Sequence, residues 1–351
     1  MKKKNLITVL ITAAISCTAF SCKDSGTGPN QKPFKDPREM TWTVDTLPVP
    51  EGAIQVLPKD LLVVSLTDVW LATWVGHGQI MHYDSKTWKM VKEIGGGINS
   101  LVQGNSNDIW AGGYSNTIYL GHYDGVSWTR SDDMGITGEI LDMSRDPYGN
   151  IWACGRNGVV LKYSQGKWVA DTIKINFSYP VEYFLKGIEY HNDMVFVLAS
   201  SMNINTLVEK YFYISGNIKN WTVVDSMILD SPTSEIKWGY RGLYSKDYNK
   251  LYSYGLSGIW KYQIGGWKKI KEVEGAINGM YNADENYVMA VGDYQKVLFY
   301  NANSWVDIRV LFNLTDPTFV FRKVWTNGYE TFITGDGNIN GIEKTMIWHG
   351  K

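Results

Sequence analysis

The segment His82-Tyr83-Asp84-Ser85-Lys86-Thr87-Trp88 decides the fold, because it recurs as His122-Tyr123-Asp124-Gly125-Val126-Ser127-Trp128 and as Lys162-Tyr163-Ser164-Gln165-Gly166-Lys167-Trp168. Each copy reads as the end of an apolar strand, a polar turn and the start of a second strand. Tryptophan returns along the chain at Trp42, Trp88, Trp128, Trp168, Trp221, Trp267 and Trp305. A strand-rich repeat of about 40–50 residues predicts a β-propeller, in which these side chains pack between blades.

The repeat that ends in the Trp168 strand divides into four strands. Residues 139–144 are expected to form the innermost strand, 150–154 the second, 159–163 the third and 167–170 the outer one. The turn 156–158 contains Asn-Gly, a strong hairpin signal because both residues tolerate positive φ. Alternating apolar residues give each sheet two apolar faces, one for each neighbouring blade.

The two ends of the chain complement each other. The last repeat stops at residues 346–351 without an outer strand, whereas Thr41-Trp42-Thr43-Val44-Asp45 matches Thr87-Trp88-Lys89-Met90-Val91. Residues 41–46 are therefore expected to complete the last blade, which pairs edges that would otherwise template aggregation. The sequence thus predicts an all-β, seven-bladed β-propeller over residues 41–351, with the N-terminal strand closing the last blade.

The composition argues against a polyanionic partner. The 351 residues are 44% hydrophobic, with a formal net charge of -1. Nucleic-acid binding needs a concentrated basic face, whereas Lys and Arg are scattered here beyond residues 2–4. We therefore expect no nucleic-acid partner.

The first 40 residues are expected to direct the protein to a membrane. Basic residues 2–4 and the apolar stretch 6–15 are typical of a signal peptide, and Ala19-Phe20-Ser21-Cys22 resembles a bacterial lipobox, whose cysteine is lipidated. Residues 1–21 would be the signal peptide and 22–40 a flexible tether. Cys17 is a competing lipidation site, and simple secretion is the other alternative. This pattern predicts a cell-envelope lipoprotein, in the outer membrane and, from the Lys23-Asp24 pair, exposed at the surface, held only by its lipid.

The stretch Asp146-Pro147-Tyr148-Gly149-Asn150-Ile151-Trp152-Ala153, followed by Leu161-Lys162-Tyr163, resembles the repeat of the two-component-regulator propeller family. In that family an Asp-x-x-Gly-Asn-apolar-Trp turn opens the second strand of each blade. The other repeats keep the Asp/Asn-apolar-aromatic core and the Tyr-x-x-x-x-Trp tail. The resemblance implies a propeller that binds ligands, often oligosaccharides. Because this chain carries no kinase segment, the resemblance favours binding over signalling.

Two patterns invite a metal hypothesis, and both have simpler explanations. His82 and His122 occupy equivalent positions, but other repeats place Lys or Phe there, which indicates an exposed strand end. Residues 336–341 copy the first half of a calcium loop, Asp-x-Asn-x-Asn-Gly, yet the twelfth position is Ile347, where calcium requires Glu. A hairpin tip explains the same residues, and no metal site is predicted.

Enzymatic motifs are scarce. The chain has no Gly-x-Ser-x-Gly elbow, Walker loop, HExxH or CxxC motif, and no cofactor is predicted. Cys154 lies in an apolar strand and is expected to be a small buried residue. A sialidase would need three arginines around one carboxylate, and nothing in the sequence shows three converging.

The most plausible binding surface is the face that carries the turns between second and third strands, together with the connections between blades. Aromatic residues mixed with Asn, Asp and Arg on a concave face suit a sugar or a protein loop. Ordinary turn chemistry explains Asn and Asp equally well, but explains Trp and Tyr less readily. The candidate residues are Trp74, His77, Tyr114, Asn116, Arg156, Asn157, Trp238, Tyr240, Arg241, Asp293, Tyr294 and Asp336.

These features predict a non-enzymatic envelope lipoprotein that acts as a protein-binding or scaffolding propeller. The alternative is a carbohydrate-binding propeller, or a carbohydrate-active enzyme that uses the same face. Carboxylates with perturbed pKa values in the central channel would favour the enzyme, and an aromatic channel without them would favour binding.

Overall fold

The computed structural model describes residues 33–351, apart from 52, 54, 105–106, 132–133, 178–180, 232–233 and 340. The predicted signal peptide, residues 1–21, and both candidate lipidation sites, Cys17 and Cys22, lie outside the described residues. The described residues are 64% strand and contain no α-helix, only the short 3-10 helices η1 (Pro37–Glu39) and η2 (Arg309–Phe312). Accordingly, no helix in this part of the chain has the length and apolarity needed to span a membrane.

The strands form six antiparallel sheets. Four of them have four consecutive strands each. The first contains β2 (Leu57–Ser65), β3 (Asp68–Trp74), β4 (Gly78–Tyr83) and β5 (Trp88–Ile94), and the second contains β6 (Gly97–Gln103), β7 (Ile109–Ser115), β8 (Thr117–Tyr123) and β9 (Trp128–Arg130). The third contains β10 (Ile140–Arg145), β11 (Ile151–Gly155), β12 (Val159–Ser164) and β13 (Lys167–Thr172), and the fourth contains β14 (Val181–His191), β15 (Met194–Asn203), β16 (Glu209–Asn217) and β17 (Asn220–Leu229).

The fifth sheet joins the two ends of the described chain. It contains β24 (Val320–Thr326), β25 (Thr331–Ile339), β26 (Ile342–Gly350) and β1 (Trp42–Leu47). β1 pairs antiparallel with β26, from Trp42 opposite Gly350 to Leu47 opposite Thr345. The N-terminal strand therefore supplies the outer edge of this sheet, the place that the matching Trp motif had indicated.

The prediction of seven separate blades is wrong, because the sixth sheet contains six strands. These are β18 (Gly242–Lys246), β19 (Lys250–Gln263), β20 (Gly266–Asp284), β21 (Tyr287–Gly292), β22 (Val297–Tyr300) and β23 (Trp305–Asp307). β20 pairs with β19 up to Ala276 and with β21 from Ile277 onward. No loop interrupts β20 between the part that pairs with β19 and the part that pairs with β21, so both parts belong to one sheet and the structure has six blades.

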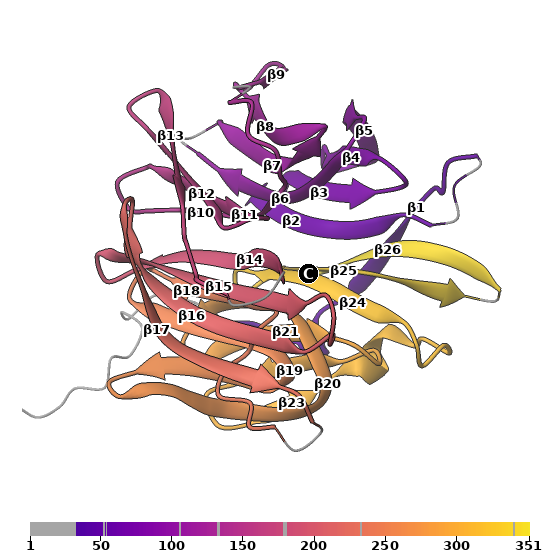
Figure 1. Cartoon of the computed structure of the whole chain (residues 1–351). Coiled ribbons are helices and arrows are strands. Elements are labelled where there is room, and N and C mark those ends of the chain that lie inside the picture. The colour runs from indigo at the N-terminus through magenta and orange to yellow at the C-terminus, as the bar shows by residue number, and fades with distance from the viewer. Residues whose placement is uncertain are drawn as a thin grey trace, which may run out of the picture. The chain divides into compact units, whose positions relative to one another are not determined.

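The sheets close into a ring around a central channel. The innermost strands contact one another in the order β2, β6, β10, β14, β18, β20, β24 and back to β2. The six-stranded sheet contributes both β18 and the second half of β20 to this ring. In Figure 1 the sheets from β2 to β13 lie in the upper half, β24–β26 lie at the right at about the height of β14, and β19, β20 and β23 lie at the bottom.

Apolar clusters between neighbouring layers hold the ring together, and the repeated tryptophans belong to them. Trp128 packs on the cluster of Trp70, Ile98 and Tyr119, which joins the first two sheets. The other six tryptophans of the series, Trp42, Trp88, Trp168, Trp221, Trp267 and Trp305, each pack against a cluster of the same kind. Their predicted structural role is confirmed.

The repeated histidines are structural as well. His82 stacks on Trp70 at 4.2 Å between ring centroids and places its Nε2 2.8 Å from Oδ1 of Asp68. The indole of Trp70 donates to the same carboxylate, at 2.6 Å. His122 repeats the stacking on Trp110, at 4.3 Å. These half-buried, paired imidazoles are not the exposed strand ends that the sequence indicated.

Two further expectations meet different outcomes. Cys154 is fully buried in β11, as predicted, and its thiol donates to the carbonyl of Leu185 at 3.4 Å. The described end of the predicted tether, however, belongs to the folded unit, which begins at Phe34. Phe34 packs against Tyr287 and Tyr329, with ring centroids 5.3 and 5.5 Å away.

Candidate functional site

Most innermost strands contain a β-bulge at the same place. The pairing with the second strand skips one residue in β2, β6, β10, β14, β20 and β24; the skipped residues are Lys59, Asn99, Leu141, Lys186, Asn278 and Arg322. Arg241 holds the corresponding place directly before β18, and its N–H donates to the carbonyl of Tyr254 at 2.9 Å. Bulges re-aim side chains and often lie next to functional sites. Here they bring side chains from all six sheets to one end of the channel.

The residue after the bulge can tie one blade to the next. The backbone N–H of Leu101 in β6 donates to Oδ2 of Asp60 in β2, at 2.8 Å. In the same way, Ile188 of β14 donates to Oδ2 of Asp142 in β10, at 2.9 Å. These two carboxylates therefore have a structural duty, because each satisfies a backbone donor that faces the channel.

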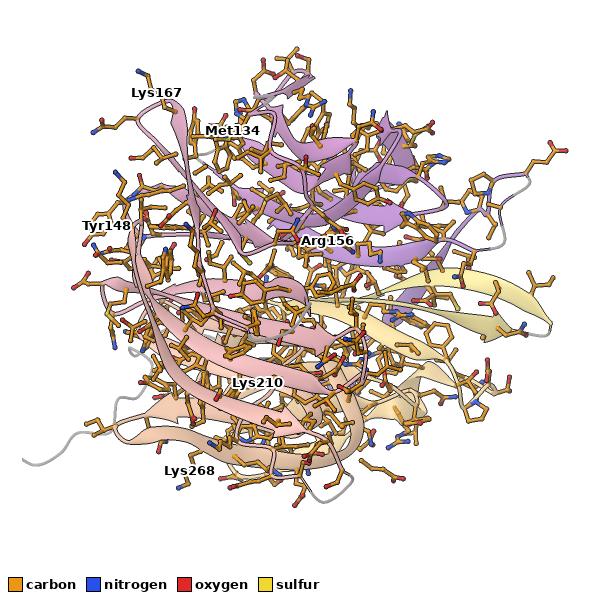
Figure 2. The ribbon with its side chains drawn as sticks, in the orientation of Figure 1. Met134, Tyr148, Arg156, Lys167, Lys210 and Lys268 are labelled. Carbon is orange, nitrogen blue, oxygen red and sulfur yellow. The ribbon has the colours of Figure 1, made fainter. Side chains whose placement is uncertain are left out.

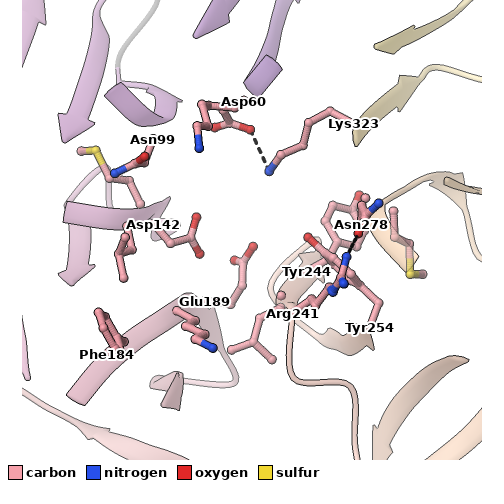
Figure 3. Close-up of a pocket in the computed structure, with 18 of the residues that line it drawn as sticks. Asp60, Asn99, Asp142, Phe184, Glu189, Arg241, Tyr244, Tyr254, Asn278 and Lys323 are labelled. Carbon is pink, nitrogen blue, oxygen red and sulfur yellow. Dashed lines mark hydrogen bonds and ion pairs between the residues drawn. The ribbon is translucent and has the colours of Figure 1, made fainter. Parts of the chain in front are cut away.

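The channel holds a cavity of about 690 Å³ (Figure 3). Ligand pockets of small molecules have volumes of about 300–1,000 Å³, so this cavity is large enough for a few side chains or a sugar. Its lining combines apolar and aromatic groups, among them Phe184, Met202, Tyr244 and Tyr254, with many charged ones. The charged lining residues are Lys59, Asp60, Glu139, Asp142, Arg156, Lys186, Glu189, Glu209, Arg241 and Lys323.

Four charged groups lie deep in the channel. Lys323 places its Nζ 3.2 Å from Oδ1 of Asp60, and the two form an ion pair. Asp142 and Glu189 face the same space, and no cation among the described residues is bonded to either. Burial raises the pKa of Asp142 to about 7. Burial, and then the charge of Asp142, raise the pKa of Glu189 well above its usual value, although the hydroxyl of Ser144 donates to Glu189 at 2.9 Å. One group of the cluster can therefore exchange a proton near neutral pH.

Lysine and arginine side chains dominate the end of the channel where the bulges lie. We call Lys59, Lys186, Arg241 and Arg322 the basic mouth. They line a hollow of about 520 Å³ that continues into the larger cavity, and Glu209 is the carboxylate among its lining residues. Potentials of one sign in a concave, low-dielectric surface attract ligands of the opposite charge.

Three of the residues predicted from sequence lie at this end of the channel. Arg156 and Arg241 line the cavity, and Tyr240 lines the hollow at the basic mouth. Two more predicted residues contact the arginines of the basic mouth. Asp293 lies 3.5 Å from Nη1 of Arg241, and Asp336 binds the guanidinium of Arg322 through two bonds of 2.6 and 2.9 Å.

The other predicted residues do not join the lining of these two hollows. Trp74 and Tyr114 lie at or near the ends of β3 and β7. The other four lie in the turns between second and third strands: His77, Asn116, Asn157 and Tyr294. The expectation that Trp238 contributes to the binding surface fails. Its side chain is fully buried among Phe196, Tyr213 and Leu243 and cannot contact a ligand. Its position in the apolar connection before β18 had suggested exposure, but that connection packs onto the sheet.

Sequence reasoning missed the residues that matter most in the channel: Lys59, Lys186, Asp142, Glu189 and Lys323. All lie within the innermost strands, where strict alternation places every side chain on a face that packs against a neighbouring blade and none in the channel. One signal was present: a charged or polar residue follows an apolar one at the same offset in most repeats, as in Pro58-Lys59, Leu185-Lys186 and Phe321-Arg322. Among the described residues, no group of His, Cys, Asp and Glu has the arrangement of a metal site.

No family model and no curated protein sequence matches this chain. Solved structures do. YCF48 bound to D1 peptide is 14% identical over 88% of this chain and 94% of that chain, with a TM-score of 0.57. YCF48 from Cyanidioschyzon merolae and the WD40 β-propeller domain of Doa1 are each 12% identical over 88% of this chain, covering 98% and 97% of theirs, with TM-scores of 0.53. At such identities the likeness shows the fold alone: the chain folds as a β-propeller.

Proposed function

We propose that this protein is a non-enzymatic binding propeller that engages a loop or an extended segment of a partner protein at the basic mouth of its channel. Tyr and Arg are, with Trp, the residues that dominate the energetics of many protein interfaces, since they combine a large contact area with a hydrogen-bonding group or a charge. At the mouth, Tyr240 lies against Tyr211 with ring centroids 4.3 Å apart, and Arg156 lies over the ring of Phe184 at 4.9 Å.

The observation that carries this proposal is the hollow mouth with the cavity that continues from it. Together their lining includes residues of every sheet and is rich in aromatic and cationic groups. A single binding surface at the ring's axis is accessible to a protruding segment but not to a flat surface. Among proteins of similar fold, YCF48 is described with a D1 peptide bound, so a propeller of this general shape accommodates a peptide.

The test is a crosslinked pull-down of the tagged, full-length protein from its own cells. The binding variant is Arg156→Ala/Tyr240→Ala. The matched control is Tyr148→Ala: Tyr148 is exposed and lies in the β10–β11 turn, at the opposite end of its sheet from Arg156 (Figure 2). We expect a near-stoichiometric partner that the control retains and the binding variant loses. Capture of no protein partner by the wild-type chain would refute the proposal.

We also propose that a lipid on Cys22 anchors the protein in the cell envelope and that its repeats belong with those of the two-component-regulator type. The anchor is supported by the sequence of residues 1–22 and the repeat type by residues 146–153. A fatty-acid label incorporated by the wild type and by Cys17→Ser, but not by Cys22→Ser, would support the lipidation site. Labelling of Cys22→Ser would disprove it.

A carbohydrate-active enzyme is the second candidate, and the raised pKa values of Asp142 and Glu189 favour it. A glycosidase needs one carboxylic acid that stays protonated near neutral pH and a second carboxylate as base or nucleophile. One observation argues against an enzyme. Asp142 accepts a backbone N–H of the next blade in the same way as the ion-paired Asp60, so the burial of Asp142 has a structural reason. Hydrolysis of an envelope polysaccharide by the wild type, abolished in Glu189→Gln, would establish the enzyme instead.

A further inference from the structure

We infer that the basic mouth recognises carboxylates of the partner, either clustered Asp and Glu side chains or a free C-terminal carboxylate. The inference rests on the proposed function, because it assigns a chemical class to what the same site binds. It depends on the placement of the four cations and on the bonds that they do and do not make.

The bulges gather like charges that a regular strand would keep apart. Lys59 comes from β2, Lys186 from β14, Arg241 from the segment before β18 and Arg322 from β24, and all four line one hollow. Like charges at close range are unfavourable in a partly desolvated site. A bound anion would offset the repulsion that Glu209, Asp293 and Asp336 leave uncompensated.

Two of these cations already have partners within the protein. Arg322 is held by Asp336, and Arg241 by Asn278 and Asp293. The guanidinium groups are thereby fixed in position.

The two lysines differ from the arginines. Within the described part of the chain, the amines of Lys59 and Lys186 form no hydrogen bond or ion pair; Lys186 only lies over the ring of Tyr211, at 5.4 Å. Burial, and then the charge of Arg322, lower the pKa of Lys59. Burial lowers the pKa of Lys186; the charge of Glu209 opposes this effect and that of Arg241 adds to it. An incoming carboxylate would supply the bonds that both amines lack.

The surroundings favour a peptide over other anions. The Tyr211–Tyr240 pair forms an aromatic wall beside Lys186, which suits the side chains next to a bound carboxylate. The formal net charge of -1, from 34 Lys and Arg against 35 Asp and Glu, lacks the basic excess typical of nucleic-acid-binding domains. Charge-assisted bonds to carboxylates add specificity as well as affinity, so an acidic motif could select the partner.

The first experiment measures retention of peptide pools on the immobilised full-length protein. One pool of eight-residue peptides has Asp or Glu at four positions and a free C-terminus; a second has amidated C-termini; a third replaces Asp and Glu by Asn and Gln. We expect the wild type to retain the acidic pool about tenfold more than the neutral pool, a ratio that corresponds to about 1.4 kcal/mol. The amidated pool separates side-chain from C-terminal recognition. Equal retention of acidic and neutral pools would overturn the inference, as would a preference for an oligogalacturonate over the acidic peptides.

The second experiment compares variants. Lys59→Gln/Lys186→Gln should lose the preference, whereas Lys59→Arg/Lys186→Arg should keep it. The matched control is Lys167→Gln/Lys268→Gln, since both lysines are exposed on the periphery (Figure 2). Undiminished preference in the Gln variant would overturn the inference.

The two proposals can fail separately. If the wild type captures a protein partner from cells and the Gln variant captures it equally well, the protein-binding function stands and the carboxylate inference fails. If no partner is captured but the acidic pool binds through the two lysines, the anion site stands and the proposed cellular function fails.

Discussion

Substituting Asp142 by Asn should stabilise the protein, and increasingly so as the pH rises. Asp142 carries a carboxylate deep in the channel, and burial raises its pKa from 3.8 to about 7. The folded protein therefore holds a proton that the unfolded chain has released between about pH 4 and pH 7. Stability decreases as the pH rises through this window, and the full penalty is present above pH 7. An asparagine amide cannot ionise, and its Oδ1 can still accept from the N–H of Ile188.

The size of the effect follows from the pKa. Each pH unit between the folded and unfolded pKa values corresponds to about 1.4 kcal/mol, so the penalty is at most about 4 kcal/mol at pH 8 and about 2 kcal/mol at pH 5.5. Water in the open channel screens the charge, and we therefore expect about half of these values. At about 2 °C per kcal/mol for a chain of this size, Asp142→Asn should raise Tm by about 4 °C at pH 8.

The assay is urea and thermal unfolding of wild type and variant from pH 4 to pH 8. Their difference in stability reports on Asp142 together with its effect on Glu189, whose pKa the charge of Asp142 raises. The matched control is Asp60→Asn, at the equivalent position of another blade: Asp60 is ion-paired, so its loss leaves the charge of Lys323 without its partner and should destabilise by about 2–3 kcal/mol. An Asp142→Asn variant less stable than wild type at pH 8, or a difference that does not grow with pH, would refute this reasoning.

Four further outcomes are expected. Trp42→Ala should cost about 2–3 kcal/mol in unfolding free energy, because it removes the edge-on contact with Phe312 from the strand that closes the ring. Asp146→Ala should cost about 3 kcal/mol by urea unfolding, since this buried carboxylate accepts two backbone N–H bonds and a bond from an indole. Cys154 should react with a thiol reagent only upon unfolding, because burial raises its pKa. Lys186→Met should raise Tm near pH 7, and the increase should become smaller toward pH 10. The pKa of Lys186 is lower in the folded protein than in the unfolded chain, so the charged amine destabilises the wild type until rising pH removes its proton.

The period of the tryptophans was enough to predict the propeller, since each Trp faces the same kind of inter-blade cluster. Trp128 and Trp168, for example, lie in corresponding places against Trp70 and Trp110. The number of sheets could not be predicted in this way. It depends on whether the part of β20 that pairs with β19 and the part that pairs with β21 form one continuous strand. A periodic pattern of side chains contains no information on that continuity of the backbone.

The candidate site was partly predictable for a related reason. Arg156, Tyr240 and Arg241 lie in turns between second and third strands or in connections between blades. In a propeller these segments share one face, so the sequence is enough to assign the three residues to it. Lys59 and Lys186 lie within strands, and only a bulge turns them into the channel. Strict alternation places such residues on the face of a neighbouring blade, where a charge would be improbable, so the unexpected charge was itself the unused signal.

The bulge joins two properties of this propeller that would otherwise be independent. In β2 the residue after the bulge, Asp60, binds the next blade and so contributes to ring cohesion, as Asp142 does after the bulge at Leu141. The bulged residue of β2, Lys59, is released from the pairing and lines the mouth, as does Lys186 in β14. Substitutions at the two positions should therefore separate the two properties. Changes at Lys59 and Lys186 should alter binding without weakening the ring, whereas Asp60→Asn should weaken the ring. If both kinds of change lowered stability alike, the mouth would be part of the structural framework and not a site free to bind a partner.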